Sequence, residues 1–524
     1  MSALRELPSK ERAMTDALHH VQASRRRILV AGIAAATAFA AQPAVSKSVS
    51  SNTNFDEEFD VLVVGSGAAG LTAGITAAEA GASTVIFEKM PYTGGSTRIS
   101  QCDMAIVGSP LQKKLGIDDK PEWLAADMQK VAGGLTDPKM ALIIARGTAG
   151  LLEFMQKRGV VFNDGLMHFG GHSAKRCMWP VGGGKGIVNP LEKHFRGLSG
   201  TKLLTRAKVD RILLDEAGRA IGLEVRENYL FDPSLQSDDN DNRSGSVRRY
   251  RARRGIVFAS GGFCRDRLIV PAEAPYLEGI SSNAQVGATA GAIRTLMEAG
   301  AYPMHMSLFR FSFPISYTDL CWGMYVDPTT GKRFVNEAEN RDVVSLAILG
   351  VKKKNGGKTP VIFYDSDAIK NFHDTRRLKR GLAGKNTCGG NIKAFDTLEE
   401  AAAAYGIPTK EFLAQVDRYN AMLDRSDDTE FGKDMKEMKG AGLRKAPFYA
   451  MQAMPFIAYT AGGARITEKA EVISARTWKP IPGLYAAGEA TGGIHGANRL
   501  TSCSVIDCGV FGMIAGREAA RPKA

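Results

Sequence analysis

Residues 59–70 read FDVLVVGSGAAG, an apolar run rich in β-branched residues that passes directly into a glycine-rich turn. The run at 59–64 predicts a buried parallel strand, because strands covered on both faces read as continuous hydrophobic stretches. The alanine-rich residues 71–81 predict a helix, and residues 83–87 (STVIF) predict a second strand. Strand, glycine turn, helix and strand in this order predict a Rossmann-type α/β fold.

The glycine turn predicts a binding site for a dinucleotide. Gly65 permits the tight turn, Gly67 lets the backbone approach a pyrophosphate, and Gly70 lets the helix pack against the strand. The first helical residues, around Ala69, offer unpaired N–H groups to phosphate oxygens. Glu88 stands 23 residues after Gly65, at the end of the second strand, where an acid accepts hydrogen bonds from an adenosine ribose.

Later segments indicate that the dinucleotide is FAD rather than NAD. A turn reading GGST at 94–97 follows the acid, where flavoproteins wrap the pyrophosphate and the isoalloxazine. A third predicted strand at 256–259 runs into SGGF, a short strand at 483–489 ends in an acid, and a predicted helix begins at 504 with its N-terminus toward the flavin pyrimidine. The candidate FAD contacts in these segments are Gly95, Ser96, Thr97, Gly261, Gly262, Glu489, Ser504 and Val505.

The length of 524 residues exceeds what one hydrophobic core organises, so more than one structural unit is expected. We expect residues 57–298 and 455–524 to form the two parts of the FAD-binding domain. Residues 299–454 are expected to form an inserted α+β capping domain that closes on the flavin and excludes water. Within that span, residues 409–425 have apolar side chains at helical spacing. The polar residues 234–246 are interpreted as a mobile solvent loop between two strands.

Residues 1–46 are interpreted as an export signal that is not part of the fold. Arg25, Arg26 and Arg27 precede an apolar run of about 14 residues, shorter than the ~20 that span a bilayer, and small residues follow it. This order resembles a twin-arginine (Tat) signal, which predicts a periplasmic protein without stable membrane insertion after the signal is removed. A frayed basic terminus or a short anchor is the alternative interpretation.

Charge and cysteine usage limit the possible partners. The net charge is +13, and residues 1–46 contain six Lys or Arg and three Asp or Glu, so the rest carries +10. That charge could steer an acidic substrate or an acidic electron carrier, and no aromatic-basic motif supports nucleic-acid binding. The seven cysteines form no CxxC or CxxCH, so neither a metal site nor covalent haem is expected. Electrons are therefore expected from a separate donor, such as a cytochrome c or a membrane quinol-linked carrier.

Two further motifs carry a resemblance to a known family. GEATGGIHGANRL at 488–500 resembles the C-terminal signature of the soluble fumarate reductase and flavocytochrome c flavoproteins. RFVNE at 333–337, with Arg341 four residues later, resembles the active-site helix of that family. The likeness covers about residues 57–524, without a haem domain. It implies an enoate reductase that reduces the C=C bond of an α,β-unsaturated carboxylate, with hydride from flavin N5.

The resemblance also implies roles for individual side chains. Arg341 matches the arginine that gives a proton to the alkene; because an arginine pKa stays above ~12, a nearby carboxylate is expected to relay the proton. Asp319 or Glu337 could be that group. Candidate substrate contacts are Asp319, Thr318, Tyr459 and His305. Alternatively, Arg341 could form a helix-surface ion pair with Glu337. Arg499 matches the arginine that grips a substrate carboxylate, for which a planar guanidinium is well suited, and a buried structural arginine is its alternative.

Departures from the family pattern bear on the substrate. Fumarate reductases carry HHTMGG, whereas residues 458–463 read AYTAGG and place Tyr459 in that stretch. Their His-Pro-Thr stretch has no clean match, although His305 lies near that point and the aromatic, apolar residues 308–317 follow it. We therefore expect a monocarboxylate with a bulky or aromatic far end, such as an arylacrylate, rather than fumarate. Ordinary core packing of these aromatic residues is the alternative.

Other functions stay open at this point. Fumarate reduction is one, and a ketosteroid-type FAD dehydrogenase, with Tyr459 or Tyr317 as a general base, is another. A non-enzymatic electron-transfer flavoprotein is the third, although Arg341 and Arg499 argue against it. FAD is expected to be non-covalent, because residues 98–100 lack the histidine through which membrane-bound relatives attach it.

Overall fold

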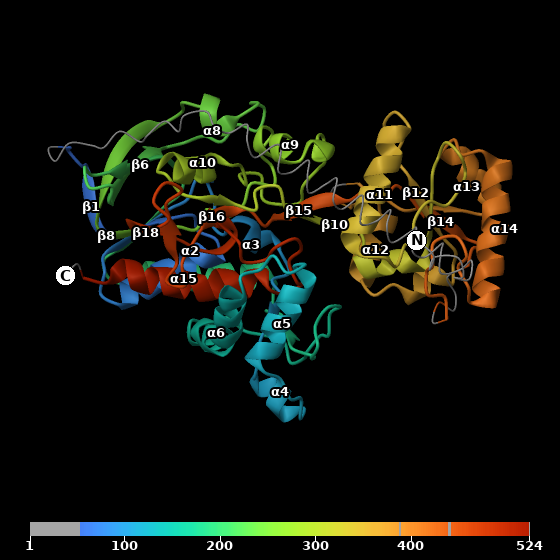
Figure 1. Cartoon of the computed structure of the whole chain (residues 1–524), viewed down its shortest axis with the longest axis horizontal. Helices are drawn as coiled ribbons and strands as arrows, with labels where there is room; N and C mark the ends of the chain where they lie inside the picture. The colour runs from blue at the N-terminus through green and yellow to red at the C-terminus, as the bar shows by residue number, and fades with distance from the viewer. Residues whose placement is uncertain (1–52, 387–388, 437, 439–441, 523–524) are drawn as a thin grey trace, which may run out of the picture.

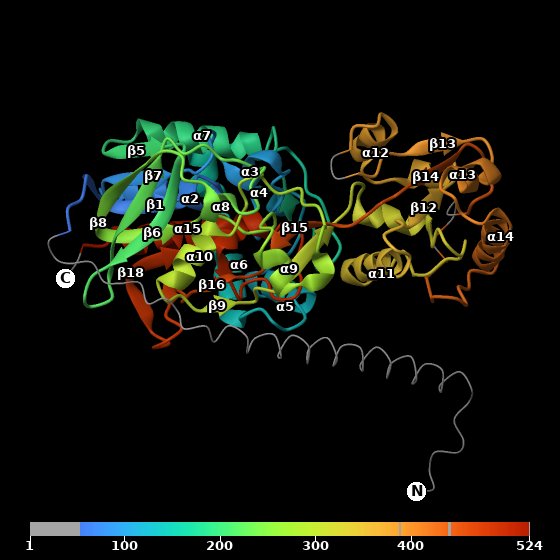
Figure 2. The same ribbon diagram turned by 90° about the horizontal axis from the view of Figure 1, so that it is seen from above.

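The computed structural model describes residues 53–386, 389–436, 438 and 442–522, so the predicted export signal lies outside the described residues. Two lobes lie side by side (Figures 1 and 2), a larger one built around a parallel sheet and a smaller one that carries helices α11 to α14. In the part of the chain that is described, no helix is long and apolar enough to cross a membrane.

The larger lobe is organised by a sheet with the strand order β17-β18-β8-β1-β2-β5. Its central strands pair in parallel, and residues 61–64 of β1 are buried, as their apolar run predicted. An antiparallel hairpin, β6–β7, continues the sheet from β8. The strands are β1 (Glu57–Val64), β2 (Thr84–Phe87), β5 (Thr201–Leu204), β6 (Ala207–Leu214), β7 (Ala220–Glu227), β8 (Ser246–Phe258), β17 (Glu471–Ile473) and β18 (Pro480–Ala486).

Two helices from opposite ends of the chain pack against each other on this sheet. Helix α2 (Ala68–Glu79) follows the glycine turn, and helix α15 (Ser504–Ala520) ends the larger lobe. A Cβ at Gly512 would lie 2.7 Å from the Ala69 carbonyl oxygen, and one at Gly516 would lie 2.2 Å from that of Ala73. The C-terminal segment therefore completes the FAD-binding fold, as the sequence predicted.

The smaller lobe is an antiparallel sheet with helices on both faces. Successive strand residues alternate between two hydrophobic cores, with Tyr325, Ile362 and Tyr364 in one and Val326 and Phe363 in the other. Helix α14 occupies Thr409–Arg425, the range that the apolar spacing predicted. The elements are β11 (Met324–Val326), β12 (Val361–Tyr364), β13 (Lys393–Phe395), β14 (Phe448–Met451), α11 (Arg341–Lys354), α12 (Thr375–Leu382), α13 (Leu398–Ala404) and α14.

The capping lobe begins later than residue 299. Strand β9 (Pro303–Met304) pairs with β16 (Gly463–Arg465) inside the larger lobe, and Ala299 and Ala301 belong to its core. The chain leaves this lobe along β10 (Phe309–Ser312) and returns along β15 (Phe456–Thr460), which pair antiparallel. The inserted lobe therefore spans about residues 313–455. Strand pairing holds the preceding residues in the larger lobe, and a change in amino-acid composition does not reveal such pairing.

The segment between β7 and β8, residues 228–245, is anchored rather than a mobile solvent loop. It connects two strands as predicted, but it contains the short helix α8 (Asp238–Asp241) and buries Asp238, Asp239 and Asn242. Buried carboxylates need partners: Asp239 accepts a hydrogen bond from Lys89 outside the segment, and Asp238 accepts hydrogen bonds from Tyr229 and Asn242 within it.

Replacement of Gly70 by Ala tests the close packing at the glycine turn. The new Cβ would lie 1.8 Å from the Gly65 carbonyl oxygen, and backbone cannot move aside as a flexible side chain can. We expect a loss of stability of at least about 1–3 kcal/mol and a reduced FAD content, measured by thermal unfolding and flavin absorbance. Gly150→Ala, on the exposed side of α6 (Pro138–Lys157) with nothing within 4 Å, is the control. Equal stability of the two variants would contradict this account of Gly70.

Candidate active site

A groove runs along the carboxyl ends of the parallel strands, where open α/β sheets bind ligands, and it holds about 960 Å³ of space that no atom fills. Most of the residues predicted to contact FAD line it together, although they come from five separate segments. These residues are Gly65, Gly67, Ala69, Glu88, Gly95, Ser96, Thr97, Gly261, Gly262 and Glu489. Gly70, Ser504 and Val505 do not line the groove, and Gly70 acts instead in the contact between helix and turn.

The groove has the features that a dinucleotide requires. The N-cap of α2 is Gly67, which has no side chain to cap the helix. The Ala68 amide donates to Thr97 Oγ1 (3.1 Å), and the helix dipole favours an anion at this end. A Cβ at Gly95 or Gly261 would meet nothing within 4 Å, so free space adjoins the backbone at both turns. The Ser260 hydroxyl is buried without a partner among the described residues. These observations fit FAD.

Glu88 fixes the end of β2 against the glycine turn. Its Oε2 accepts hydrogen bonds from the Ser66 amide (3.1 Å) and hydroxyl (2.5 Å), and its Oε1 accepts one from the Met90 amide (2.9 Å). Burial raises the pKa of Glu88 above its usual value. A carboxylate can accept about four hydrogen bonds, so capacity remains for a ribose hydroxyl.

Glu489 joins the C-terminal signature to the strand that returns from the cap. Its Oε1 accepts hydrogen bonds from the Thr460 amide (2.9 Å) and hydroxyl (3.2 Å), and burial raises its pKa to about 7. A Cβ at Gly262 would lie 2.3 Å from that oxygen, so the turn after β8 needs glycine to pack here.

Three arginines meet between the lobes, and no carboxylate of the described residues forms an ion pair with them. Arg310 lies on β10, Arg341 is the first residue of α11, and Arg499 lies in the turn before α15. Burial and its two arginine neighbours depress the pKa of Arg310, and burial lowers the pKa of Arg341 to about 10, with Arg499 contributing. Among the described residues, their hydrogen bonds go to carbonyls and one threonine hydroxyl.

The two predicted arginines have hydrogen-bonding capacity to spare. The Nε of Arg341 and the Nε of Arg499 are buried, and no acceptor among the described residues bonds to either. Arg310, in contrast, donates from Nε to the Arg499 carbonyl (3.2 Å) and from Nη2 to the Thr501 hydroxyl (3.4 Å). Buried cations with unused N–H groups favour an anion, and a carboxylate matches the guanidinium fork.

Aromatic rings cover both of these arginines. The Arg341 guanidinium lies 4.8 Å from the Tyr317 ring centre, and that of Arg499 lies 4.8 Å from the Tyr459 ring centre. His495 packs edge-on against Tyr459, and its Nε2 lies 3.1 Å from Asp507 Oδ2. Tyr459 therefore lies against Arg499, and its contact with the substrate stays a prediction.

The phenylalanines of residues 308–317 are part of the cores of the two lobes. Phe309 and Phe311 belong to the core of the larger lobe and Phe313 to that of the cap, each at most 5 % exposed. This burial favours core packing as the role of these aromatic residues over contact with the substrate. Arg310 stands between them as a lone charge in an apolar run, a signal that the sequence analysis missed.

Other predicted substrate contacts lie elsewhere. Asp319 accepts hydrogen bonds from the amides of His373 (2.8 Å) and Asp374 (3.3 Å), and burial raises its pKa. Thr318 is exposed and pairs with the Ser316 hydroxyl, and His305 lies in a turn after β9 with a buried, unpartnered Nδ1. Within the described residues, no hydrogen bond or ion pair links these three to Arg341 or Arg499, so their substrate roles stay predictions.

Glu337 is not a partner of Arg341. It forms buried ion pairs with Arg333 (2.9 Å) and Lys433 (3.1 Å), and it accepts a hydrogen bond from the Tyr325 amide. Burial alone would raise the pKa of Glu337, but Lys433 and Arg333 hold it below its usual value. The helix-surface ion pair considered for Arg341 is therefore wrong, because α11 begins at Arg341 and Glu337 precedes it.

Comparison with known proteins gives this site a family. A sequence family described as "FAD binding domain" matches residues 60–505. The chain belongs to this family. It is an FAD-dependent oxidoreductase, and it is 34% identical over 512 residues to the acrylate reductase flavoprotein subunit of Shewanella woodyi, with 94% of this chain and 97% of the relative aligned. It is 32% identical to the urocanate reductase of Eggerthella lenta, over 88% of this chain and 75% of that one.

Solved structures support the same fold. The open conformation of a flavocytochrome c3 fumarate reductase matches with a TM-score of 0.75 and 29% identity, over 89% of this chain and 79% of that one. A 3-ketosteroid-Δ4-(5α)-dehydrogenase from Rhodococcus jostii matches with a TM-score of 0.70 and 24% identity, over 91% of this chain and 99% of that one, a likeness of fold alone.

Replacement of Glu337 by Gln separates a structural role from a proton relay. Removing one member of a buried ion network leaves Arg333 and Lys433 undercompensated, which typically costs about 3–5 kcal/mol. We expect a lower Tm but an unchanged kcat per FAD-loaded molecule, with Glu339→Gln at an exposed position as the control. A kcat that falls 100-fold at an unchanged Tm would instead identify Glu337 as a relay.

Proposed function

We propose that this flavoprotein reduces the C=C bond of an α,β-unsaturated monocarboxylate. The observation that carries the proposal is the meeting of Arg341 and Arg499, from opposite lobes, each with a buried N–H that no described group accepts. Such a pair suits a small anion that is held by one arginine and protonated by the other. The relatives that are named acrylate and urocanate reductases support this substrate class.

The groove of the larger lobe is proposed to hold FAD without a covalent bond. The turn from Gly65 to Gly67 and the start of α2 would bind the pyrophosphate, and Glu88 would bind the adenosine ribose. Bound FAD supplies a hydride to one carbon of the alkene. Arg98, at the position considered for covalent attachment, instead donates hydrogen bonds to the Thr93 carbonyl and to Asn189.

Arg341 is proposed to donate the proton to the neighbouring carbon. A pKa of about 10 makes this guanidinium a stronger acid than one in water, and the Tyr317 ring helps to hold it in place. Asp342, whose Oδ1 is buried without a partner and whose pKa burial raises to about 6, shares the surroundings of Arg341. We assign the relay to Asp342, because Asp319 and Glu337 are bonded elsewhere.

Arg499 is proposed to grip the substrate carboxylate, with Tyr459 stacked on its guanidinium. Arg310 supports it by donating to the Arg499 carbonyl. Fumarate is a second candidate substrate, since three arginines carry more positive charge than one carboxylate neutralises. Relatives named fumarate reductase are 26–30% identical to this chain.

Export and electron supply complete the proposal. The twin-arginine cluster at residues 25–27 supports export by the Tat route and a periplasmic location. A separate donor, such as a cytochrome c or a membrane quinol-linked carrier, would deliver electrons, since the sequence contains no CxxCH haem motif.

Anaerobic reoxidation of the reduced flavin tests the reaction. Acrylate, urocanate, cinnamate and fumarate are added in turn to protein reduced with dithionite, and flavin absorbance is followed. We expect rapid reoxidation by at least one enoate and a loss of roughly 10²–10⁴-fold in Arg341→Ala, the range for removal of a general acid. Lys354→Ala, at the exposed end of α11, is the control. A wild-type rate in Arg341→Ala, or no reoxidation by any enoate, would overturn the proposal.

Replacement of Arg310 by Gln decides between the two substrate classes. If Arg310 only supports Arg499, KM rises by a similar factor for acrylate and fumarate, and the monocarboxylate stays the better substrate. If Arg310 binds a second carboxylate, fumarate alone loses tenfold or more in kcat/KM, which is about 1.4 kcal/mol. The measurement is steady-state reduction of both acids with reduced viologen as the donor.

A further inference from the structure

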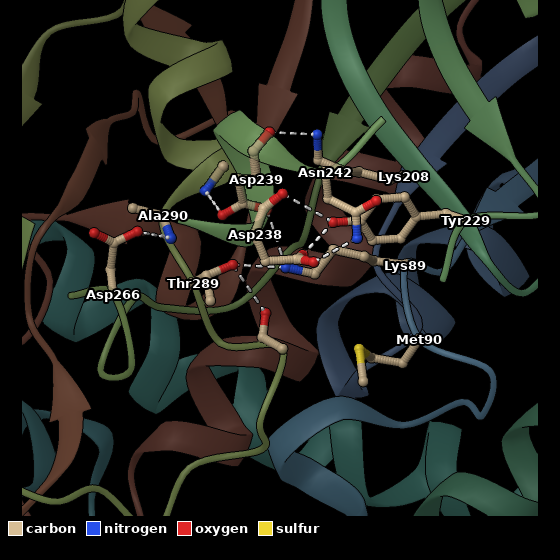
Figure 3. A network of polar contacts seen from close by, with 12 residues as sticks. Lys89, Met90, Lys208, Tyr229, Asp238, Asp239, Asn242, Asp266, Thr289 and Ala290 are labelled. Carbon is tan, nitrogen blue, oxygen red and sulfur yellow. Dashed lines mark hydrogen bonds and ion pairs between the residues drawn. The ribbon is translucent and has the colours of Figure 1, made fainter. Parts of the chain in front are cut away.

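The insert between β7 and β8, residues 228–245, reaches the FAD groove. Figure 3 shows a network of polar contacts around Asp238 and Asp239 of its helix α8. Asp239 lines the groove together with Lys89, Lys208 and Thr289. Lys89 directly follows Glu88, so the insert forms part of the groove wall at the end assigned to the adenosine.

Asp239 joins three elements at this end of the groove. Its Oδ1 lies 3.2 Å from Lys89 Nζ, and its Oδ2 accepts a hydrogen bond from the Gly291 amide (2.8 Å) at the start of α10 (Gly291–Glu298). Arg294 of the same helix lies 3.4 Å from Oδ2. Burial alone would raise the pKa of Asp239, but Lys89, Lys208 and Arg294 keep it below its usual value. The carboxylate is therefore a buried anion held by cations from outside the insert.

The lysines are held just as firmly. Lys89 Nζ also donates to the Thr289 hydroxyl (2.6 Å) and lies 5.4 Å from the ring centre of Phe231 in the insert. Lys208 Nζ donates to the backbone carbonyl of Asp239 (2.8 Å). An unpaired Lys89 would place a free ammonium beside Glu88, where a ribose hydroxyl is expected. Asp239 neutralises that charge and holds the Lys89 side chain away from the ribose position.

The insert is braced internally before it meets the groove. Asp238 Oδ2 accepts a hydrogen bond from the Tyr229 hydroxyl. Asp238 Oδ1 accepts from the Asp232 amide (2.8 Å) and the Asn242 side chain (2.7 Å). The adjacent carboxylates thus divide two tasks: Asp238 shapes the insert, and Asp239 docks it on the groove.

We propose that residues 228–245 clamp the adenosine half of FAD and that Asp239 is the positioning residue of this clamp. The inference rests on the proposed orientation of FAD, with its adenosine at Glu88. Two contacts support this assignment: Asp239 itself lines the groove, and it holds the lysine next to Glu88. Glycine at 291 is required for the docking, because a Cβ there would lie 2.4 Å from Asp239 Cγ.

The test measures the dissociation constants of added ligands for the full chain after its FAD has been removed. Asp239→Asn is expected to bind FAD and ADP at least tenfold more weakly than wild type, with FMN binding unchanged, since FMN lacks the adenosine. Once saturated with FAD, the variant is expected to keep the wild-type midpoint potential. Asp241→Asn, on the exposed side of α8, is the matched control and is expected to bind all three ligands normally.

Gly291→Ala provides a second route to the same loss, since it displaces Asp239 without changing its charge. Wild-type binding of FAD and ADP by Asp239→Asn would overturn the clamp. Equal weakening of ADP and FMN binding would also overturn it, because it would show general damage to the groove. The readout is binding, so a failure of enoate reduction would leave this result interpretable.

Discussion

The contact between α2 and α15 is the constraint on which the rest of the molecule depends. Gly512 and Gly516 let α15 lie against the backbone of α2, so segments more than 400 residues apart form one FAD-binding fold. That packing brings Glu489, which precedes α15, into the groove beside the glycine turn. It also leaves the middle of the chain free to form a separate lobe between β10 and β15.

The site between the lobes concentrates positive charge that folding alone does not favour. Arg310 is buried and Arg341 and Arg499 are partly buried, and no carboxylate among the described residues pairs with them, which costs free energy. Local rule-breaking of this kind is expected at functional sites. A bound carboxylate would satisfy the unused N–H groups. The arrangement therefore lowers the stability of the protein without a bound anion and favours the binding of one.

The buried carboxylates differ in how far the protein satisfies them. Glu337 is saturated by Arg333 and Lys433, and Asp239 by Lys89, Arg294 and a helix amide, so both organise structure. Asp342, next to Arg341, keeps a buried oxygen to which no described residue bonds. Partner geometry, rather than proximity in the sequence, separates a structural acid from one that is free to exchange a proton.

The sequence by itself determined the Rossmann strand that includes residues 59–64, the glycine turn and the helix that follows it, the bounds of α14 and the family, because these depend on local periodicity or on contiguous motifs. Only the tertiary structure decided the start of the cap, the position of Arg310 and the docking of Asp239. Lys89 and Asp239 are 150 residues apart, and Arg310 and Arg499 are 189 apart. Spacing along one segment carries no information about such partners, because the folding of the whole chain brings them together.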